Sequence, residues 1–377
     1  MCTLAISKSS CYMRYLSIFL ILICWSCSNK QSQTTQEETQ SIKPKNIILL
    51  IGDGTGLSQI SASQFYNDTV SNYDQFKHIG LIKTSSSNSL ITDSAAGATA
   101  FASGIKTYNG AIGVDTDTIA QPTILEQLAQ KGYATGVIAT SSITHATPAS
   151  FYAHVPYRRM EDDIAIALAE SPVQFFAGGG INFFSTEKRK DQKDILGMLT
   201  QKTFQVDTTA LPNPQTILDP TKKYGYLLAN GGMPKVLEGR GSFLTDATQL
   251  GIQHLSQDGD GFFLMVEGSQ VDWGGHANDT DFLISELIDF DDAIGAALAF
   301  AKSDKETLVI VTADHETGGF SLSSDKGDYN TLKPSFSTGG HTATMVPVFA
   351  YGPGSERFQG IYENNLIYNK MAALLLD

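Results

Sequence analysis

Residues 46–56 read NIILLIGDGTG, an apolar run that ends in a glycine-rich turn around Asp53. An apolar run of this length, with no polar alternation, is typical of a strand that is buried on both faces of a sheet. The glycines interrupt the strand, and a helical pattern continues from them to about Asn67. The stretch therefore predicts a strand, a turn and a helix, the repeating unit of an α/β fold.

The same alternation continues along the chain. It predicts an α/β fold with a mostly parallel central sheet and helices on both faces. In such sheets, functional sites form at the carboxyl ends of the strands. The strand-like runs lie at 80–84, 134–140, 174–177, 261–266, 307–313 and 346–351, and the helical segments lie at 123–131, 162–170, 244–255, 282–302 and 364–376.

A second stretch, TDSAAGATA at 92–100, places a hydroxyl beside a carboxylate at the start of a predicted helix. Ser94 falls at the N-cap or in the first turn, where unpaired backbone N–H groups can bind an anion. A serine in this position can also be a helix cap and nothing more. The stretch alone leaves both interpretations open.

Acidic and imidazole side chains follow three of the apolar runs. Asp53 follows NIILLIG, Glu267 and Asp272 follow FFLMV, and Asp314 and His315 follow LVIVTA. Each of them alone fits a turn or a helix cap. Several carboxylates at one sheet edge would repel one another unless cations neutralise them, so together they predict a metal site.

Composition restricts the function further. The chain has 377 residues, of which 42% are hydrophobic, and a net charge of −13, with no Lys/Arg run, which argues against nucleic acid as a partner. The four cysteines all lie within the first 27 residues. The body of the chain therefore offers neither disulfides nor thiolate ligands, and any metal must bind Asp, Glu or His.

The opening segment has the pattern of an export signal. Lys8 and Arg14 precede an apolar run at 15–25 that is too short to span a bilayer comfortably. Ser26 and Cys27 resemble a bacterial lipoprotein cleavage site, which predicts a lipid anchor on Cys27. Plain secretion remains an alternative.

We therefore expect a signal peptide at 1–27, a flexible polar tether at 28–44 and a catalytic domain at 45–377. Met13 is an alternative start that would give a more compact signal. The expected location is outside the cytoplasm, either in the periplasm or on the cell surface or outer membrane as a lipoprotein.

At the level of motifs, the chain resembles the bacterial alkaline phosphatases from about Pro44 to the C-terminus. Six blocks occur in the order found in that family, which makes the resemblance specific. They are IGDGTG at 51–56, TDSAAGATA at 92–100, HATPASFYAHVPYR at 145–158, VEGSQVDWGGH at 266–276, TADHETGG at 312–319 and GGHT at 339–342.

The resemblance implies a nucleophile and its helpers. Ser94 would attack phosphorus and become a phosphoserine, which water then hydrolyses. Arg158 would bind two phosphoryl oxygens through its planar fork, and Asp93 would position that guanidinium.

The resemblance also implies two Zn²⁺ and one Mg²⁺. One zinc would bind Asp272, His276 and His341, and a second would bind Asp53, Asp314 and His315. Two metals roughly 4 Å apart can hold the attacking and leaving oxygens of an in-line displacement. Magnesium would bind oxygen ligands from Asp53, Glu267 and Thr147.

Two residues depart from the family pattern beside the third metal. His145 stands where enterobacterial relatives carry Asp, and Trp273 stands where they carry Lys and animal enzymes carry His. These departures affect the occupancy of that metal site and the affinity for phosphate. The remaining histidines, His78, His154 and His254, match no ligand position and are interpreted as structural, and 183–224 is expected to be an accessory segment.

The expected function is metal-dependent hydrolysis of small phosphate monoesters, which releases inorganic phosphate outside the cytoplasm, by an enzyme that can be a homodimer. One alternative is a phosphodiesterase or sulfatase of the same superfamily. A sulfatase would have Pro and Arg two and four places after the nucleophile, where this chain has Ala96 and Ala98. Another alternative is a non-catalytic surface lipoprotein that binds metal or phosphate.

Overall fold

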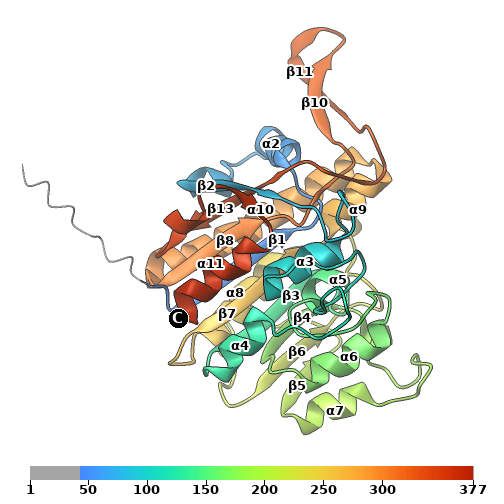
Figure 1. The fold of residues 1–377 in the computed structure, drawn as a ribbon, viewed down its shortest axis with the longest axis vertical. Coiled ribbons are helices and arrows are strands. Elements are labelled where there is room, and N and C mark those ends of the chain that lie inside the picture. Colours follow the sequence, from blue (N-terminus) through green and yellow to red (C-terminus); the bar gives the residue numbers. More distant parts are fainter. Residues whose placement is uncertain (1–42, 377) are drawn as a thin grey trace, which may run out of the picture. The chain divides into compact units, whose positions relative to one another are not determined.

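A ten-stranded sheet runs through the computed structural model, which describes residues 43–376 (Figure 1). Every neighbouring pair of strands is parallel except the two pairs that include β13. The prediction of a mostly parallel sheet is therefore confirmed. In spatial order the strands are β14 (Gly360–Glu363), β2 (His78–Lys83), β13 (Val346–Tyr351), β8 (Thr307–Thr312), β1 (Asn46–Gly52), β7 (Phe262–Gly268), β3 (Ala134–Ser142), β4 (Phe175–Gly179), β6 (Lys223–Leu227) and β5 (Phe204–Asp207).

The first apolar run forms the central strand β1, which lies between β7 and β8. Its side chains alternate between two hydrophobic cores, with Ile47, Leu49 and Ile51 on one face and Ile48 and Leu50 on the other. All five are fully buried, which explains the unbroken apolar run.

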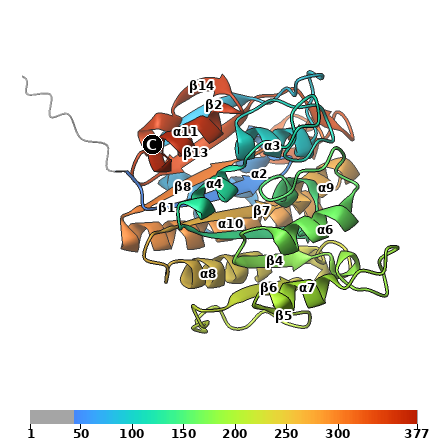
Figure 2. The same ribbon diagram turned by 60° about the horizontal axis from the view of Figure 1, so that its bottom comes forward.

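Helices cover both faces, as predicted, and Figures 1 and 2 show the resulting three layers. Helices α2 (Leu57–Tyr66), α8 (Phe243–Leu255) and α10 (Thr280–Asp304) pack on the Ile48 and Leu50 face. The opposite face carries α3 (Ser94–Ser103), α4 (Ile124–Gln130), α5 (Ala146–Ala149), α6 (Glu161–Glu170), α7 (Ile195–Gln201) and α11 (Leu366–Leu375).

Several smaller elements complete the body. The short 3₁₀ helices within residues 43–376 are η1 (Asn72–Gln75), η2 (Ile181–Phe183), η3 (Val236–Glu238) and η4 (Ser355–Phe358). Helix α9 (Gln270–Ala277) follows β7. A two-stranded ladder joins β9 (Glu316–Thr317) to β12 (His341–Thr342). This ladder brings two of the quoted motif blocks into direct contact.

The sequence did not predict the strands β6 and β14 or two larger parts of the fold. The segment 183–224, expected to be accessory, contains α7 and β5 and reaches the start of β6, so it extends the main sheet at one edge. Between β9 and β12, a hairpin of β10 (Ser321–Asp325) and β11 (Asp328–Ser335) projects away from the sheet (Figure 1). Its mostly polar, partly exposed residues carry no strong strand signal.

The predicted signal peptide at 1–27, and the tether at 28–44 apart from its last two residues, lie outside the described residues. Within residues 43–376, no helix is both long enough and apolar enough to cross a membrane.

Candidate active site

The carboxyl ends of β1, β7 and β8 meet at one edge of the sheet. Ile51 of β1 is in register with Glu267 of β7 and with Thr312 of β8, so the residues that follow these strands lie close together. Asp53, Glu267 and Asp314 are all fully buried there. The convergence predicted from the strand ends is therefore present.

A first group consists of Asp53, Asp314 and His315. Nε2 of His315 lies 3.4 Å from Oδ1 of Asp53 and 3.2 Å from Oδ2 of Asp314. Both carboxylate oxygens of Asp53, and Oδ2 of Asp314, are buried without a hydrogen-bond partner. Buried anionic oxygens are costly unless a cation or a donor faces them, so this group fits a metal ion.

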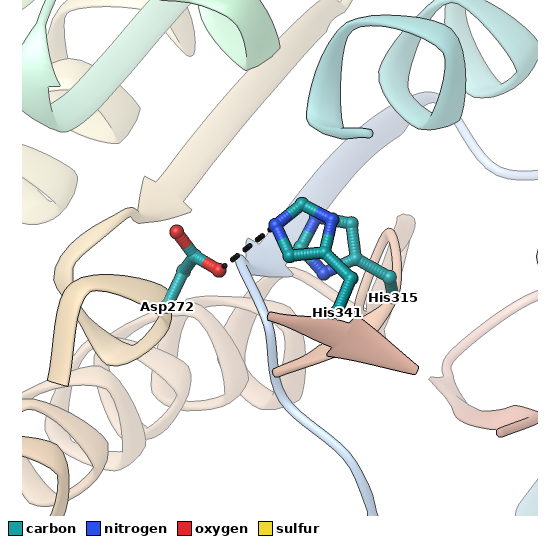
Figure 3. Close-up of side chains that lie close together, drawn as sticks. All are labelled: Asp272, His315 and His341. Carbon is teal, nitrogen blue, oxygen red and sulfur yellow. Dashed lines mark ion pairs between the residues drawn. The ribbon is translucent and has the colours of Figure 1, made fainter. Parts of the chain in front are cut away.

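A second group consists of Asp272, His276 and His341. Nε2 of His341 lies 3.5 Å from Oδ1 of Asp272, and Nε2 of His276 lies 3.4 Å from Oδ2. Figure 3 shows Asp272 and His341 facing each other, with the ring of His315 stacked against that of His341 at 3.5 Å between centroids. Ligand atoms of Asp272, His315 and His341 lie within 4.8 Å of one another.

The tautomers of the second group can be read from its contacts. Nδ1 of His276 lies 2.7 Å from the carbonyl oxygen of Gly339, and Nδ1 of His341 lies 2.9 Å from that of Thr92. A carbonyl oxygen only accepts, so each Nδ1 carries a hydrogen and each neutral ring leaves its lone pair on Nε2. Because these two Nε2 atoms lie 3.1 Å apart beside a carboxylate, a shared cation fits the space between them.

A third group surrounds Glu267. One of its oxygens accepts from the hydroxyls of Ser269 at 2.6 Å and Ser141 at 3.2 Å, while the other has no partner. Ligand atoms of Asp53, His145 and Glu267 lie within 4.8 Å of one another. The sequence placed His145 at the border of this site, and the structure places it within the group.

Burial controls the protonation of these side chains. It raises the pKa of Asp53 well above its usual range, and the charges of Asp314, Asp272 and Glu267 raise it further. Burial also raises the pKa of Glu267, to about 7, and that of Asp314. Burial holds the pKa of His315 well below its usual range, and a proton on His341 would lower it further. Bound dications would reverse these shifts in the acids, because they favour the ionised form.

Ser94 is the first residue of α3 and is 2% exposed. Asp93 caps the helix by accepting from the backbone N–H of Ala96 at 3.0 Å, so the cap role that the sequence allowed for Ser94 belongs to its neighbour. Oγ of Ser94 lies 3.4 Å from Nε2 of His315. The hydroxyl thus faces the first group and is not used for capping.

Arg158 is held from two sides. Its Nη1 donates to Oδ2 of Asp93 at 3.0 Å, and its Nη2 lies 3.3 Å from Nε2 of His145. Burial and the charge of Arg158 lower the pKa of His145 to about 3, so the imidazole is neutral and accepts this bond. Asp93 therefore contacts Arg158 as the resemblance implied.

A cavity of about 480 Å³ opens beside Arg158. Its walls include Asn109, Tyr157 and Arg159, which the sequence did not single out, together with Asp93, Gly110, His145 and Glu161. This space can receive the part of a substrate that is not transferred.

The other residues that the sequence analysis named pack against or hydrogen-bond to neighbouring protein groups. Trp273 packs with its ring edge against His145, with centroids 6.2 Å apart. His154 lies between the carbonyl of Gly113 at 2.7 Å and Glu126 at 2.9 Å. His78 contacts Ser355, and His254 packs against Phe175 and Tyr224.

One neighbour of the site gave no signal in the sequence. Thr317 lies in the block TADHETGG, but a threonine in a polar loop indicates no particular role. Its side chain is fully buried between Asp272 and His315.

Comparisons with known proteins agree on one family. A profile described as alkaline phosphatase matches residues 44–336. Alkaline phosphatase 3 of Bacillus subtilis is 36% identical over 411 aligned positions, covering 86% of this chain and 87% of that protein. The alkaline phosphatase of Escherichia coli is 31% identical and covers 89% of this chain and 88% of its own length.

Solved structures give the same result. The alkaline phosphatase of the Antarctic bacterium TAB5 is 57% identical, covers 89% of this chain and 99% of its own, and superposes with a TM-score of 0.86. A mutant of that enzyme, with a histidine replaced by aspartate, is described with Mg bound in its M3 site. The chain therefore belongs to the alkaline phosphatase family, and it is a metal-dependent enzyme that hydrolyses phosphate monoesters.

Proposed function

We propose that Ser94 is the nucleophile of this phosphatase and that hydrolysis proceeds through a phosphoserine. The observation that carries the proposal is the position of its hydroxyl, buried at the start of α3 and 3.4 Å from the imidazole of His315. A serine used as a cap would bind the backbone of its own helix, whereas Asp93 does that here.

Two Zn²⁺ fit the first and second groups. Asp53, Asp314 and His315 would hold one ion, and Asp272, His276 and His341 the other. The unpartnered carboxylate oxygens of the first set and the facing Nε2 atoms of the second support this assignment. When bound, the ions supply positive charge that lowers the pKa of the Ser94 hydroxyl and stabilises the leaving oxygen.

Mg²⁺ fits the third group, where Asp53, Glu267 and Thr147, all fully buried, would provide oxygen atoms. His145 reaches the same group, and a neutral imidazole is a poorer ligand for magnesium than a carboxylate. The TAB5 mutant described with Mg bound there carries aspartate in place of a histidine. We expect His145 to weaken magnesium binding in this enzyme.

The chain's own groups account for orientation and charge. Arg158 would bind two oxygens of the transferred phosphoryl group, with Asp93 and His145 fixing the plane of its guanidinium. Oγ of Ser94 then gives up its proton to water and bonds to phosphorus, the bond to the leaving oxygen breaks, and that oxygen takes a proton from water. In the second step the oxygen of a water molecule loses a proton to solvent and bonds to phosphorus, the bond from phosphorus to Oγ breaks, inorganic phosphate departs, and Oγ of Ser94 takes a proton from water.

Placement outside the cytoplasm belongs to the same proposal. The segment 1–27 would direct export, lipidation of Cys27 would anchor the protein, and 28–44 would tether the catalytic domain at 45–377. An enzyme that acts in the periplasm or on the cell surface meets phosphate monoesters before they enter the cell. The enzyme can assemble as a homodimer, as the family resemblance implied.

Acid quenching during turnover tests the nucleophile. A monoester with labelled phosphate should leave the label on the peptide that contains Ser94, and Ser94→Ala should abolish the label and lower kcat by roughly a thousandfold or more. Ser103→Ala is the matched control, because it also removes a hydroxyl from α3. That hydroxyl contacts only the carbonyl of Gln121. Label trapped on a different residue would overturn the assignment of Ser94.

A further inference from the structure

Thr317 has a side chain that joins the two proposed zinc groups. It is fully buried, its Oγ1 donates to Oδ1 of Asp272, and the same oxygen lies 3.2 Å from Nδ1 of His315. Asp272 belongs to one group and His315 to the other. A single hydroxyl therefore contacts a ligand from each.

The hydrogen count fixes the direction of both bonds. A carboxylate only accepts, so the one hydrogen of the Thr317 hydroxyl is used toward Asp272, and the hydroxyl oxygen is left to accept from His315. Nδ1 of His315 must then carry its hydrogen, which leaves the lone pair on Nε2. That nitrogen is the atom that faces Asp53 and Asp314 at 3.4 and 3.2 Å.

The other two histidines show the same arrangement with a different acceptor. Nδ1 of His276 and Nδ1 of His341 each lie against a backbone carbonyl, whereas Nδ1 of His315 lies against the Thr317 hydroxyl. All three rings are thereby turned so that Nε2 points to the metal groups. Thr317 differs because its acceptor is also a donor to a ligand of the neighbouring group.

The backbone of Thr317 is held by the same surroundings. Its N–H donates to the carbonyl of Gly54 at 3.0 Å, its carbonyl accepts from Nε2 of Gln59 at 2.9 Å, and it pairs with His341 in the β9–β12 ladder. Contacts therefore extend from this one residue to the segments that carry Asp53, Asp272, His315 and His341.

Packing leaves the side chain little freedom. A Cβ at Gly54, which has φ of +71°, would lie 2.8 Å from Oγ1 of Thr317, and a Cβ at Gly275 would lie 3.0 Å from its methyl carbon. Glycine at these two positions lets the threonine fit between the ligand-bearing segments. The hydroxyl is thus directed by the fold toward Asp272 and His315.

We propose that Thr317 is a positioning residue that couples the two zinc sites by fixing the tautomer of His315 and the carboxylate of Asp272 at the same time. The inference rests on the proposed ligand sets. A purely structural role, in which the methyl group fills space and the backbone forms the ladder, is the competing explanation.

The tautomer gives a test that does not depend on catalysis. In metal-free wild-type enzyme labelled with ¹⁵N-histidine, His315 should show its hydrogen on Nδ1, with the signal assigned by its loss in His315→Gln. A hydrogen on Nε2 of His315 would overturn the proposal, and this measurement needs no substitution at Thr317.

Metal affinity gives the second test. Zinc titrations against a competing chelator should show Thr317→Val binding zinc roughly 10- to 100-fold more weakly at both sites, because groups that orient metal ligands contribute this much. Thr317→Ser keeps the hydroxyl and should stay close to wild type. Thr248→Val is the matched control, since that buried threonine only donates to the carbonyl of Leu244.

The outcomes separate this inference from the proposed function. Wild-type affinity in Thr317→Val, loss at one site alone, or an equal loss in Thr317→Ser would overturn the coupling role while leaving Ser94 and the ligand sets untouched. If the wild-type enzyme itself takes up no zinc at these ligands, the proposed metal assignment fails, and the inference fails with it. The Co²⁺ absorption spectrum provides an independent readout, because Thr317→Val should alter it and Thr248→Val should not.

Discussion

Two clusters of buried acids in this molecule are neutralised in different ways. In one, Arg240 donates to Glu286 at 2.5 Å and to Asp289 at 2.7 Å, and these three side chains are 1%, 2% and 8% exposed. In the other, Asp53 and Asp314 are at least as deeply buried, yet three of their four oxygens have no hydrogen-bond partner. In the first cluster the chain supplies a cation that bonds both acids, and only Nε of Arg240 lacks a partner, whereas in the second the carboxylate oxygens themselves lack one.

The difference separates a structural cluster from a functional one. Burial is the largest cause that raises the pKa of acids in both places, including that of Asp289, to about 6, so a shifted pKa does not distinguish them. The distinguishing feature is the missing partner. A fold that keeps several buried carboxylates together without a side-chain cation indicates a site made for an external one.

Among the changes that test this contrast, metal removal should have the largest effect, and the effect should be on activity. Chelation should lower kcat by several orders of magnitude, since the charge that stabilises the reacting oxygens is lost, and added Zn²⁺ and Mg²⁺ should restore it. Far-UV circular dichroism should change little, because the two hydrophobic cores contain none of the proposed ligands. Full activity in protein shown by metal analysis to lack zinc would refute the mechanism.

Arg240→Met should have the opposite effect to metal removal, because it should lower stability and leave activity nearly unchanged. It leaves Glu286 and Asp289 buried without their partner, which costs about 3–5 kcal/mol in the free energy of unfolding. Denaturant unfolding measures this loss, and kcat per folded enzyme should remain within about twofold of wild type. A variant with unchanged stability would show that the two clusters do not differ as described.

The pH dependence of stability should differ between the metal-free and metal-bound enzyme. Because the pKa values of Asp53 and Glu267 are raised in the folded state, the folded protein binds more protons than the unfolded one above about pH 4. Stability of the metal-free enzyme should therefore fall as the pH rises from about 4 through 7. The Tm should drop by a few degrees over this range.

With metals bound, the same carboxylates are stabilised as anions, so the Tm of the loaded enzyme should not fall between pH 5 and 8. Differential scanning calorimetry on both forms makes the comparison. If Tm changed with pH in the same way in both forms, the buried acids would not face the metals.

Trp273→Lys should have the smallest effect of these changes, and the effect should be on inhibition by phosphate. A lysine cation about 7 Å from bound phosphate, at an effective dielectric near 20, contributes on the order of 2 kcal/mol before screening, so inhibition by phosphate should tighten by up to tenfold. If product release limits turnover, kcat should fall in parallel.

The structure also shows the alternative for this residue, since Trp273 packs on His145 and a Cβ at Gly232 would meet its ring at 2.5 Å. Metal content and Tm serve as controls. An unchanged inhibition constant for phosphate, with metals retained, would mean that the indole only packs.

Much of this architecture could be predicted from the sequence because the central strands are apolar on both faces. The runs that became β1, β7 and β8 are long and unbroken, and the acids that follow them converge for that reason. Strands β5, β6 and β14 and the β10–β11 hairpin were missed, because short strands at or near the sheet edges and exposed hairpins carry polar residues and lack a clear period.

Within the site, a different cause limits what could be predicted from the sequence. The ligand types followed from chemistry and from the family resemblance, but orientation depends on contacts between distant segments. Nothing in the sequence indicates that Thr317 lies between Asp272 and His315. The family resemblance placed His145 at the border of the third site, but not within reach of Asp53 and Glu267. These contacts arise only when the β9–β12 ladder and α5 are in place.

Anomalous diffraction at the zinc edge, on crystals of the enzyme grown with zinc, tests the central contrast most directly. We predict two strong peaks, one among Asp53, Asp314 and His315 and one among Asp272, His276 and His341, with none beside Arg240, Glu286 and Asp289. Absence of peaks at the first two places, or a peak of equal strength at the third, would contradict the conclusion that unpartnered buried acids mark the metal sites.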